Sequence, residues 1–296
     1  MPFIGELCGL LTAVCWSGSS LAFSAATLRV GPIRLNVTRL IFAAALLFVA
    51  VVVTGGDIHL SSSQLRNLVI SGIIGLVIGD TFLFKSYEII GARLGMLIIS
   101  VAPAISALLA YLLLGEILSW IAVLGMAVTL LGITIVVLER RETITGTRRR
   151  HLEGIVFGFL AAVGQGAALV LAKMAFNEGP INGFVATFVR IVSSTIVIWP
   201  LAWMAGKYDD AFSIYKKDRK ALWLTILGAF LGPFLGITLS LISVANTTVG
   251  IAATLMATVP ILMLPLVKYV QKDHISWRAI LGATIAVGGV AILFTR

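Results

Sequence analysis

The sequence predicts an all-α membrane protein, with ten transmembrane helices in two inverted five-helix repeats around a central cavity. Composition, the spacing of apolar windows and an internal duplication support this fold class. Hydrophobic residues make up 59% of the 296-residue chain and charged residues 12%, whereas a soluble domain usually carries about twice that share of charge. The mean hydropathy is +1.06. Such a composition is typical of a chain that lies mostly within a bilayer.

Ten windows are long and apolar enough to cross the membrane, since a spanning helix needs about 20 mostly apolar residues. They cover residues 4–27, 34–54, 65–88, 92–114, 118–138, 153–177, 182–205, 221–243, 248–270 and 275–295. Only two connecting segments are substantial, 139–151 and 206–220. Both are too short and too polar to form a soluble catalytic domain.

The duplication relates residues 71–116 to a weaker copy at 227–273. The matched features are Gly75 and Gly79 with Gly228 and Gly232, Pro103 with Pro260, and Ser119-Trp120 with Ser276-Trp277. We therefore predict a first repeat at 1–138, a basic cytoplasmic linker at 139–151 and a second repeat at 152–296. Each repeat contains five helices, and an odd number forces the second repeat to enter the membrane from the opposite side. Inverted repeats with a site between them are a common plan of secondary transporters.

Basic residues predict the orientation. Most of the 22 Lys and Arg residues lie in or beside the loops that follow helices 1, 3, 5, 7 and 9, and basic loops stay in the cytoplasm. Both termini are therefore predicted outside a cell inner (plasma) membrane. This placement explains the pI near 9.9 without nucleic acid. The N-terminus has no basic region of a cleavable signal, so we expect the first helix to be retained.

Several residues resemble those of a known family. They are Trp16-Ser17-Gly18 in helix 1, Arg39 and Arg190 early in helices 2 and 7, and Pro103 and Pro260 in helices 4 and 9, each followed by an acidic residue. The chain resembles the drug/metabolite transporter superfamily, EamA type, over nearly its whole length. The resemblance implies export of small metabolites, with amino-acid exporters as the nearest model. The second repeat departs from it at Gly164-Gln165-Gly166, which replaces the Trp-Ser-Gly of helix 1.

Asp80 is the acid deepest in the predicted membrane. It lies roughly 12 Å from the cytoplasmic end of helix 3, and Arg39 lies roughly 8 Å in from the same side in helix 2. Charges at such depth are costly and are usually paired or lie along a transport pathway. We expect an ion pair between Asp80 and Arg39. It would act either as a gating or proton-sensitive latch or as a static lock between two helices.

The second repeat has no counterpart of this acid, because the repeat alignment places Pro233 where Asp80 stands. An unpaired Arg190 could then bind a substrate carboxylate. In the alternative interpretation, Arg190 pairs with Glu6 or Glu178 or extends to the lipid headgroups. Lys173 is a second candidate for gating or coupling, and the resemblance also implies a lysine here; it too could simply reach the headgroups.

Polar and aromatic residues recur at helical spacing and predict faces that converge on a cavity. The candidate substrate-binding residues, besides Arg190, are Trp16, Ser20, Phe23, Phe84, Tyr87, Ser100, Tyr111, Gln165, Ser240, Thr254 and Thr258. Each serine or threonine alone is also explained by helix packing. Pro103 and Pro260 are expected to bend helices beside the cavity, because each removes a helical hydrogen bond.

These patterns favour a secondary active or facilitative transporter that exports small metabolites, most of all amino acids, by alternating access of one half against the other. Cationic drugs or other amphiphilic metabolites are the alternative cargo, and phosphorylated metabolites rank third. An intramembrane enzyme is the competing class, but no nucleophile and base can be assembled and no nucleotide-binding or hydrolase motif is present. We expect no metal, since His59, His151 and His274 have no partners at metal-ligand spacing, and no cofactor. The expected partners are a small-molecule substrate and the lipid bilayer, with the protein a monomer or homodimer.

Overall fold

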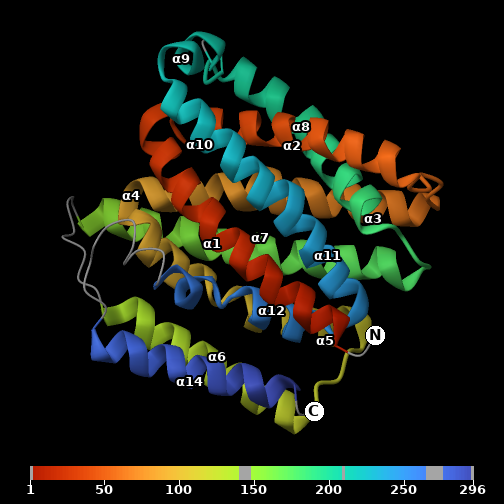
Figure 1. The fold of residues 1–296 in the computed structure, drawn as a ribbon, viewed down its shortest axis with the longest axis vertical. Helices are drawn as coiled ribbons and strands as arrows, with labels where there is room; N and C mark the ends of the chain where they lie inside the picture. The colour runs from red at the N-terminus through yellow and green to blue at the C-terminus, as the bar shows by residue number, and fades with distance from the viewer. Residues whose placement is uncertain (1–2, 140–147, 209–210, 265–275, 295–296) are drawn as a thin grey trace.

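The computed structural model describes residues 3–139, 148–208, 211–264 and 276–294, and every regular element in these ranges is a helix. Most of the long helices lie side by side with their axes roughly parallel or antiparallel (Figure 1). Eight are long and apolar enough to cross a membrane, and two shorter apolar helices, Ala102–Leu114 and Val249–Leu264, fall in the fourth and ninth predicted windows. Most of the predicted linker 139–151, and Asp273 of the second repeat, lie outside the described residues.

The elements follow the predicted windows closely. The first repeat holds α1 (Ile4–Val30), α2 (Pro32–Thr54), α3 (Ser62–Gly72), the π-helix η1 (Ile73–Gly79), α4 (Asp80–Ile99), α5 (Ala102–Leu114) and α6 (Trp120–Glu139). The second holds α7 (Arg148–Asn177), α8 (Gly183–Met204), a short α9 (Ala211–Lys217), α10 (Arg219–Ala229), the π-helix η2 (Phe230–Gly236), α11 (Ile237–Asn246), α12 (Val249–Met256) and α14 (Trp277–Phe294).

Local sequence signals account for several boundaries. Ser61 and Gln64 form a reciprocal capping box at the start of α3, which satisfies two free backbone N–H groups. Gly91 interrupts α4 with φ 80°, a conformation that glycine adopts without steric cost. The chain therefore ends its third crossing at Gly91 and begins the fourth directly after it. Asp218 caps α10 by accepting from the N–H of Ala221 at 2.9 Å.

The contacts between α6 and α14 show that the repeats are inverted. Gly125, early in α6, lies against Gly289 and Leu293, late in α14, whereas Gly132 lies against Gly282 and Ala286. Residue numbers rise along one helix as they fall along the other, so the two helices are antiparallel. Because each is the fifth crossing of its repeat, the repeats enter the membrane from opposite sides. The two helices lie side by side at one edge of the molecule (Figure 1).

The sequence repeats do not form two separate bundles. Helix α1 packs mainly on α10, η2, α11 and α12 of the second repeat, and α7 packs mainly on α3, η1, α4 and α5 of the first. Gly228 lies against Phe23, and Gly236 lies against Trp16, so small residues let α1 approach closely. Movement of one sequence half against the other stays a prediction; in this architecture each repeat contributes its first helix to the group formed mainly by the other repeat.

The two π-helices occupy matched places and correct the repeat alignment. The offset that relates Pro103 to Pro260 also relates η1 to η2, so Asp80, which directly follows η1, corresponds to Ile237. The match of Asp80 with Pro233 is wrong by a few residues, because the glycines recur every four residues and permit more than one register. The second repeat still carries no acid at this position.

Candidate substrate cavity

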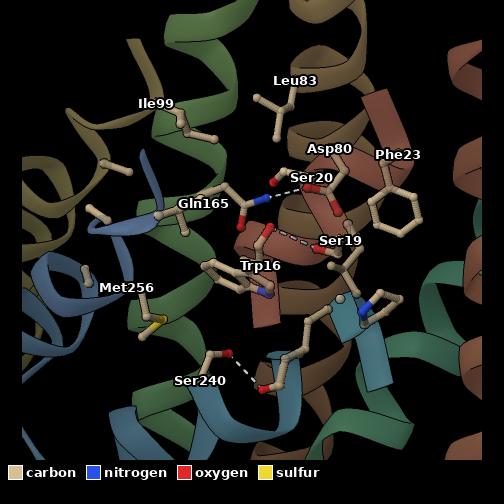
Figure 2. Close-up of a pocket in the computed structure, with 18 of the residues that line it drawn as sticks. Trp16, Ser19, Ser20, Phe23, Asp80, Leu83, Ile99, Gln165, Ser240 and Met256 are labelled. Carbon is tan, nitrogen blue, oxygen red and sulfur yellow. Dashed lines mark hydrogen bonds between the residues drawn. The ribbon is translucent and has the colours of Figure 1, made fainter. Parts of the chain in front are cut away.

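A cavity of about 180 Å³ lies between the two groups of helices. A single water requires only about 10–15 Å³ measured in this way, so there is room for a small organic molecule. Both repeats contribute to the wall: α1, α2, α4 and α5 from the first, and α7, α8, α11 and α12 from the second. Figure 2 shows side chains from these helices converging on the cavity, with Trp16, Gln165 and Met256 around it.

Most of the predicted site residues line this cavity. They are Trp16, Ser20, Phe23, Arg39, Asp80, Phe84, Tyr87, Ser100, Pro103, Gln165, Arg190, Ser240 and Pro260. Helical spacing places these residues on the cavity-facing sides of their helices, and the fold brings those helices together around one cavity.

Four candidates are placed elsewhere: Tyr111, Thr254 and Thr258, and also Lys173, which is described below. Tyr111, near the C-terminal end of α5, is 60% exposed on the outside of the bundle and does not line the cavity. Thr254 and Thr258 are buried, but their hydroxyls donate to the Gly250 carbonyl at 2.8 Å and the Leu255 carbonyl at 2.7 Å. The prediction that Tyr111, Thr254 and Thr258 line the cavity is wrong for this structure, because Tyr111 faces outward and each threonine hydroxyl bonds a backbone carbonyl three or four residues earlier.

The expected ion pair between Arg39 and Asp80 is present and is buried at the cavity wall. The second carboxylate oxygen of Asp80 accepts from Gln165 Nε2 at 2.7 Å, a bond drawn in Figure 2. Arg39 also donates to Asn36 Oδ1 from Nε at 3.0 Å and from the terminal nitrogen at 2.8 Å. Its guanidinium carbon lies 5.2 Å from the Phe23 ring centre and 4.9 Å from that of Phe84. Both charged groups therefore have several hydrogen-bonding or aromatic partners.

Arg190 is the second arginine of the cavity, and its side chain is less well satisfied. It is 3% exposed, and within the described part of the chain its buried Nε has no hydrogen-bond partner. The acids proposed as partners are engaged elsewhere: Glu178 accepts from Ser61 and Ser63, and Glu6 accepts from Thr247. Asp80 interacts electrostatically with Arg190 as well as with Arg39. Two arginines and one carboxylate leave this group with a net positive charge.

The comparisons with known proteins identify the family. The model of the EamA-like transporter family matches residues 3–138 and 152–295. The chain belongs to the EamA-like transporter family. A protein of known crystal structure shares 20% sequence identity with this transporter and superposes with a TM-score of 0.77, over 97% of this chain and 95% of that one. This likeness shows the fold alone. A search of curated proteins found no match.

Lys173 of this EamA transporter does not line the cavity. Its Nζ donates to the carbonyl oxygens of Val244 at 2.8 Å and Thr247 at 3.1 Å, at the end of α11. Glu116 accepts from the backbone N–H of Val249, the first residue of α12, at 2.9 Å. Charges of opposite sign thus cap two helix ends in the manner that helix dipoles favour. Together they hold the connection between α11 and α12 at the face of the protein where α1 begins.

Sequence reasoning missed several wall residues. Ser19 lies beside Ser20, and its hydroxyl donates to the Trp16 carbonyl at 3.2 Å. Leu76, Gly232, Pro233 and Ile237 line the cavity because the π-helices run beside it. Inserted π-turns are frequent at functional sites, and the glycines within each run, together with Pro233, were the signal available in the sequence. The apolar wall residues carried no such signal, because Leu and Ile are common everywhere in this chain.

Proposed function

We propose that this EamA transporter exports amino acids by alternating access through the central cavity. The observation that carries the proposal is Arg190: a buried guanidinium at the cavity wall whose Nε has no partner among the described residues. A buried donor without a partner is costly. A substrate carboxylate would satisfy it, and guanidinium–carboxylate pairs are among the strongest hydrogen-bonded contacts.

The charge of the cavity argues against cationic cargo. Asp80 is the carboxylate that lines the cavity in the described ranges, and its two oxygens already accept from Arg39 and Gln165. A cationic drug would have to compete for this acid and would lie near two arginines. A phosphorylated metabolite would need several converging cations, and Lys173 is engaged with helix carbonyls instead.

The packing suggests which bodies move. One group is α1 with α10, η2, α11 and α12, and the other is α7 with α3, η1, α4 and α5. The cavity lies between them, and the bonds from Lys173 to the end of α11 tie the two groups at one face. We propose that release of this tie opens the cavity on that face. With the basic loops in the cytoplasm, the tied face is the outer side of the inner membrane.

Counterflow in proteoliposomes tests this function. Vesicles loaded with one unlabelled amino acid at a time should take up trace amounts of the same labelled amino acid, and empty vesicles should not. A panel of cationic dyes, offered in the same vesicles, should be neither exchanged nor inhibitory. Exchange of dyes without exchange of amino acids would replace the proposal with the cationic alternative, and no exchange of either would refute it.

A further inference from the structure

Two backbone carbonyls at the cavity lack their helical hydrogen-bond donors. Pro103 and Pro260 have no N–H, so the carbonyl oxygens four residues earlier, those of Ile99 and Met256, lose the partner that a continuous helix would supply. Helix α4 ends at Ile99 and α12 ends at Met256. Neither oxygen accepts a backbone hydrogen bond from any residue that the structure describes.

Both carbonyls belong to residues of the cavity wall. Ile99, Pro103, Met256 and Pro260 all line the cavity, and Figure 2 places Ile99 and Met256 on its border. A helical carbonyl points along the helix axis toward the residue four positions later. Each oxygen therefore lies between two residues of the same wall, one oxygen from each repeat.

The electrostatics of these helix ends favour a cation or a hydrogen-bond donor. The last carbonyls of a helix carry a partial negative charge, and broken helices in transporters place such ends at their binding sites. A carbonyl left without a donor inside a protein is costly unless water or a ligand pairs with it. Arg190 lines the same cavity and requires a hydrogen-bond acceptor, since its buried Nε has no partner among the described residues.

We propose that the carbonyl oxygens of Ile99 and Met256 form a subsite for a primary ammonium group. The inference rests on the proposed function, in which Arg190 holds the carboxylate of an amino acid, and it identifies what receives the other end of the zwitterion. The group bound must carry N–H donors, because carbonyl oxygens are hydrogen-bond acceptors. A quaternary ammonium is excluded from the subsite for the same reason.

The test compares pairs of probes that differ only at the nitrogen. Leucine and phenylalanine are measured against 4-methylpentanoate and 3-phenylpropanoate, and against their N-trimethyl derivatives, by equilibrium competition on the purified full-length protein. The wild-type protein should prefer each amino acid to its deaminated partner by about tenfold or more, as expected for one or two charge-assisted hydrogen bonds. The trimethylated forms should bind no better than the deaminated ones.

Pro103→Ala and Pro260→Ala each return an N–H to the freed carbonyl. Each should lower the preference for the amino acid about tenfold and leave binding of the deaminated compound unchanged. The matched control is Pro200→Ala, because Pro200 also lies inside a helix but is exposed and away from the cavity; it should keep the full preference.

The outcomes separate the two proposals. If the wild-type protein binds deaminated or trimethylated compounds as tightly as the amino acids, the ammonium subsite is refuted and the carboxylate site stands. If the proline variants weaken both members of a pair equally, the prolines serve the helix bend and the subsite is also refuted. If the wild-type protein binds no amino acid and no carboxylate, both proposals fall. Should the variants not fold, the comparison of the three probe types on wild-type protein still refutes the subsite if it finds no preference for the primary ammonium.

Discussion

Replacement of Asp80 by asparagine removes a buried carboxylate that interacts with both Arg39 and Arg190. The structure gives the size of the effect. Breaking a buried ion pair by removing one partner typically costs about 3–5 kcal/mol, but Arg39 keeps Asn36 and two aromatic rings. The asparagine oxygen can accept from only one former partner while its NH₂ group faces the other donor. We therefore expect Asp80→Asn to lower stability by about 3 kcal/mol, the lower end of that range.

Thermal unfolding of purified protein, followed by loss of the monodisperse chromatographic peak, measures this change. A double-mutant cycle with Arg39→Gln isolates the pair: the double variant should be more stable than the sum of the single effects predicts, by 1 kcal/mol or more, in the range of about 0.5–3 kcal/mol found for residues in contact. If Asp80 serves as a static lock, transport per folded molecule should stay near the wild-type value. Loss of transport per folded molecule would instead identify the pair as a gate, and an interaction energy near zero would refute the coupling.

Three further predictions concern the scaffold and the tie between the helix groups. Gly289→Ala should destabilise the protein by about 1–3 kcal/mol, because a Cβ there would lie 2.8 Å from the Gly125 carbonyl oxygen. Gly288→Ala is the control and should not destabilise the protein, since a Cβ at Gly288 would have open space around it. Equal melting temperatures of the two variants would contradict this prediction. Lys173→Met should raise the accessibility of the α11–α12 connection to a membrane-impermeant thiol reagent, tested with a cysteine at Asn246 in both backgrounds; unchanged labelling would show that the lysine is no tie. Hydrogen bonds from the backbone of Ala221 and from Arg29 hold the pKa of Asp218 below its usual range. The ionised carboxylate therefore contributes stability above its usual pKa, and this contribution is lost as pH falls through the lowered pKa. Asp218→Asn should flatten the fall of the melting temperature at acid pH, and an unchanged profile of melting temperature against pH would contradict the assignment.

The sequence predicted the crossings and much of the cavity wall, because both depend on periodicity. Apolar windows set the spans, and the helical spacing of Trp16, Ser20 and Phe23 set a face that the structure places on the cavity. The Arg39–Asp80 pair could be predicted from the sequence, because the two residues lie at similar depth in consecutive crossings.

Other features depend on packing between distant segments, which periodicity does not encode. Helices α1 and α7 each pack mainly on helices of the other repeat, an arrangement that depends on how the folded helices fit together. Tyr111 has the right spacing, but α5 turns that side chain outward. Lys173 was identified as a candidate, yet its carbonyl partners at the end of α11 could only be found once α7 and α11 were placed side by side.

Binding of paired ligands to Arg190 variants tests the central claim most directly. Purified wild-type, Arg190→Gln and Arg190→Lys proteins are titrated with an amino acid and with its carboxamide, which lacks the negative charge; Arg66→Gln, at an exposed arginine, is the control. A charged hydrogen bond is worth about 1.5–3 kcal/mol. Arg190→Gln should therefore weaken binding of the amino acid about 10- to 150-fold and leave the carboxamide unaffected, with the lysine variant between. Equal losses for both ligands, or none for either, would contradict the role of Arg190 as the carboxylate site.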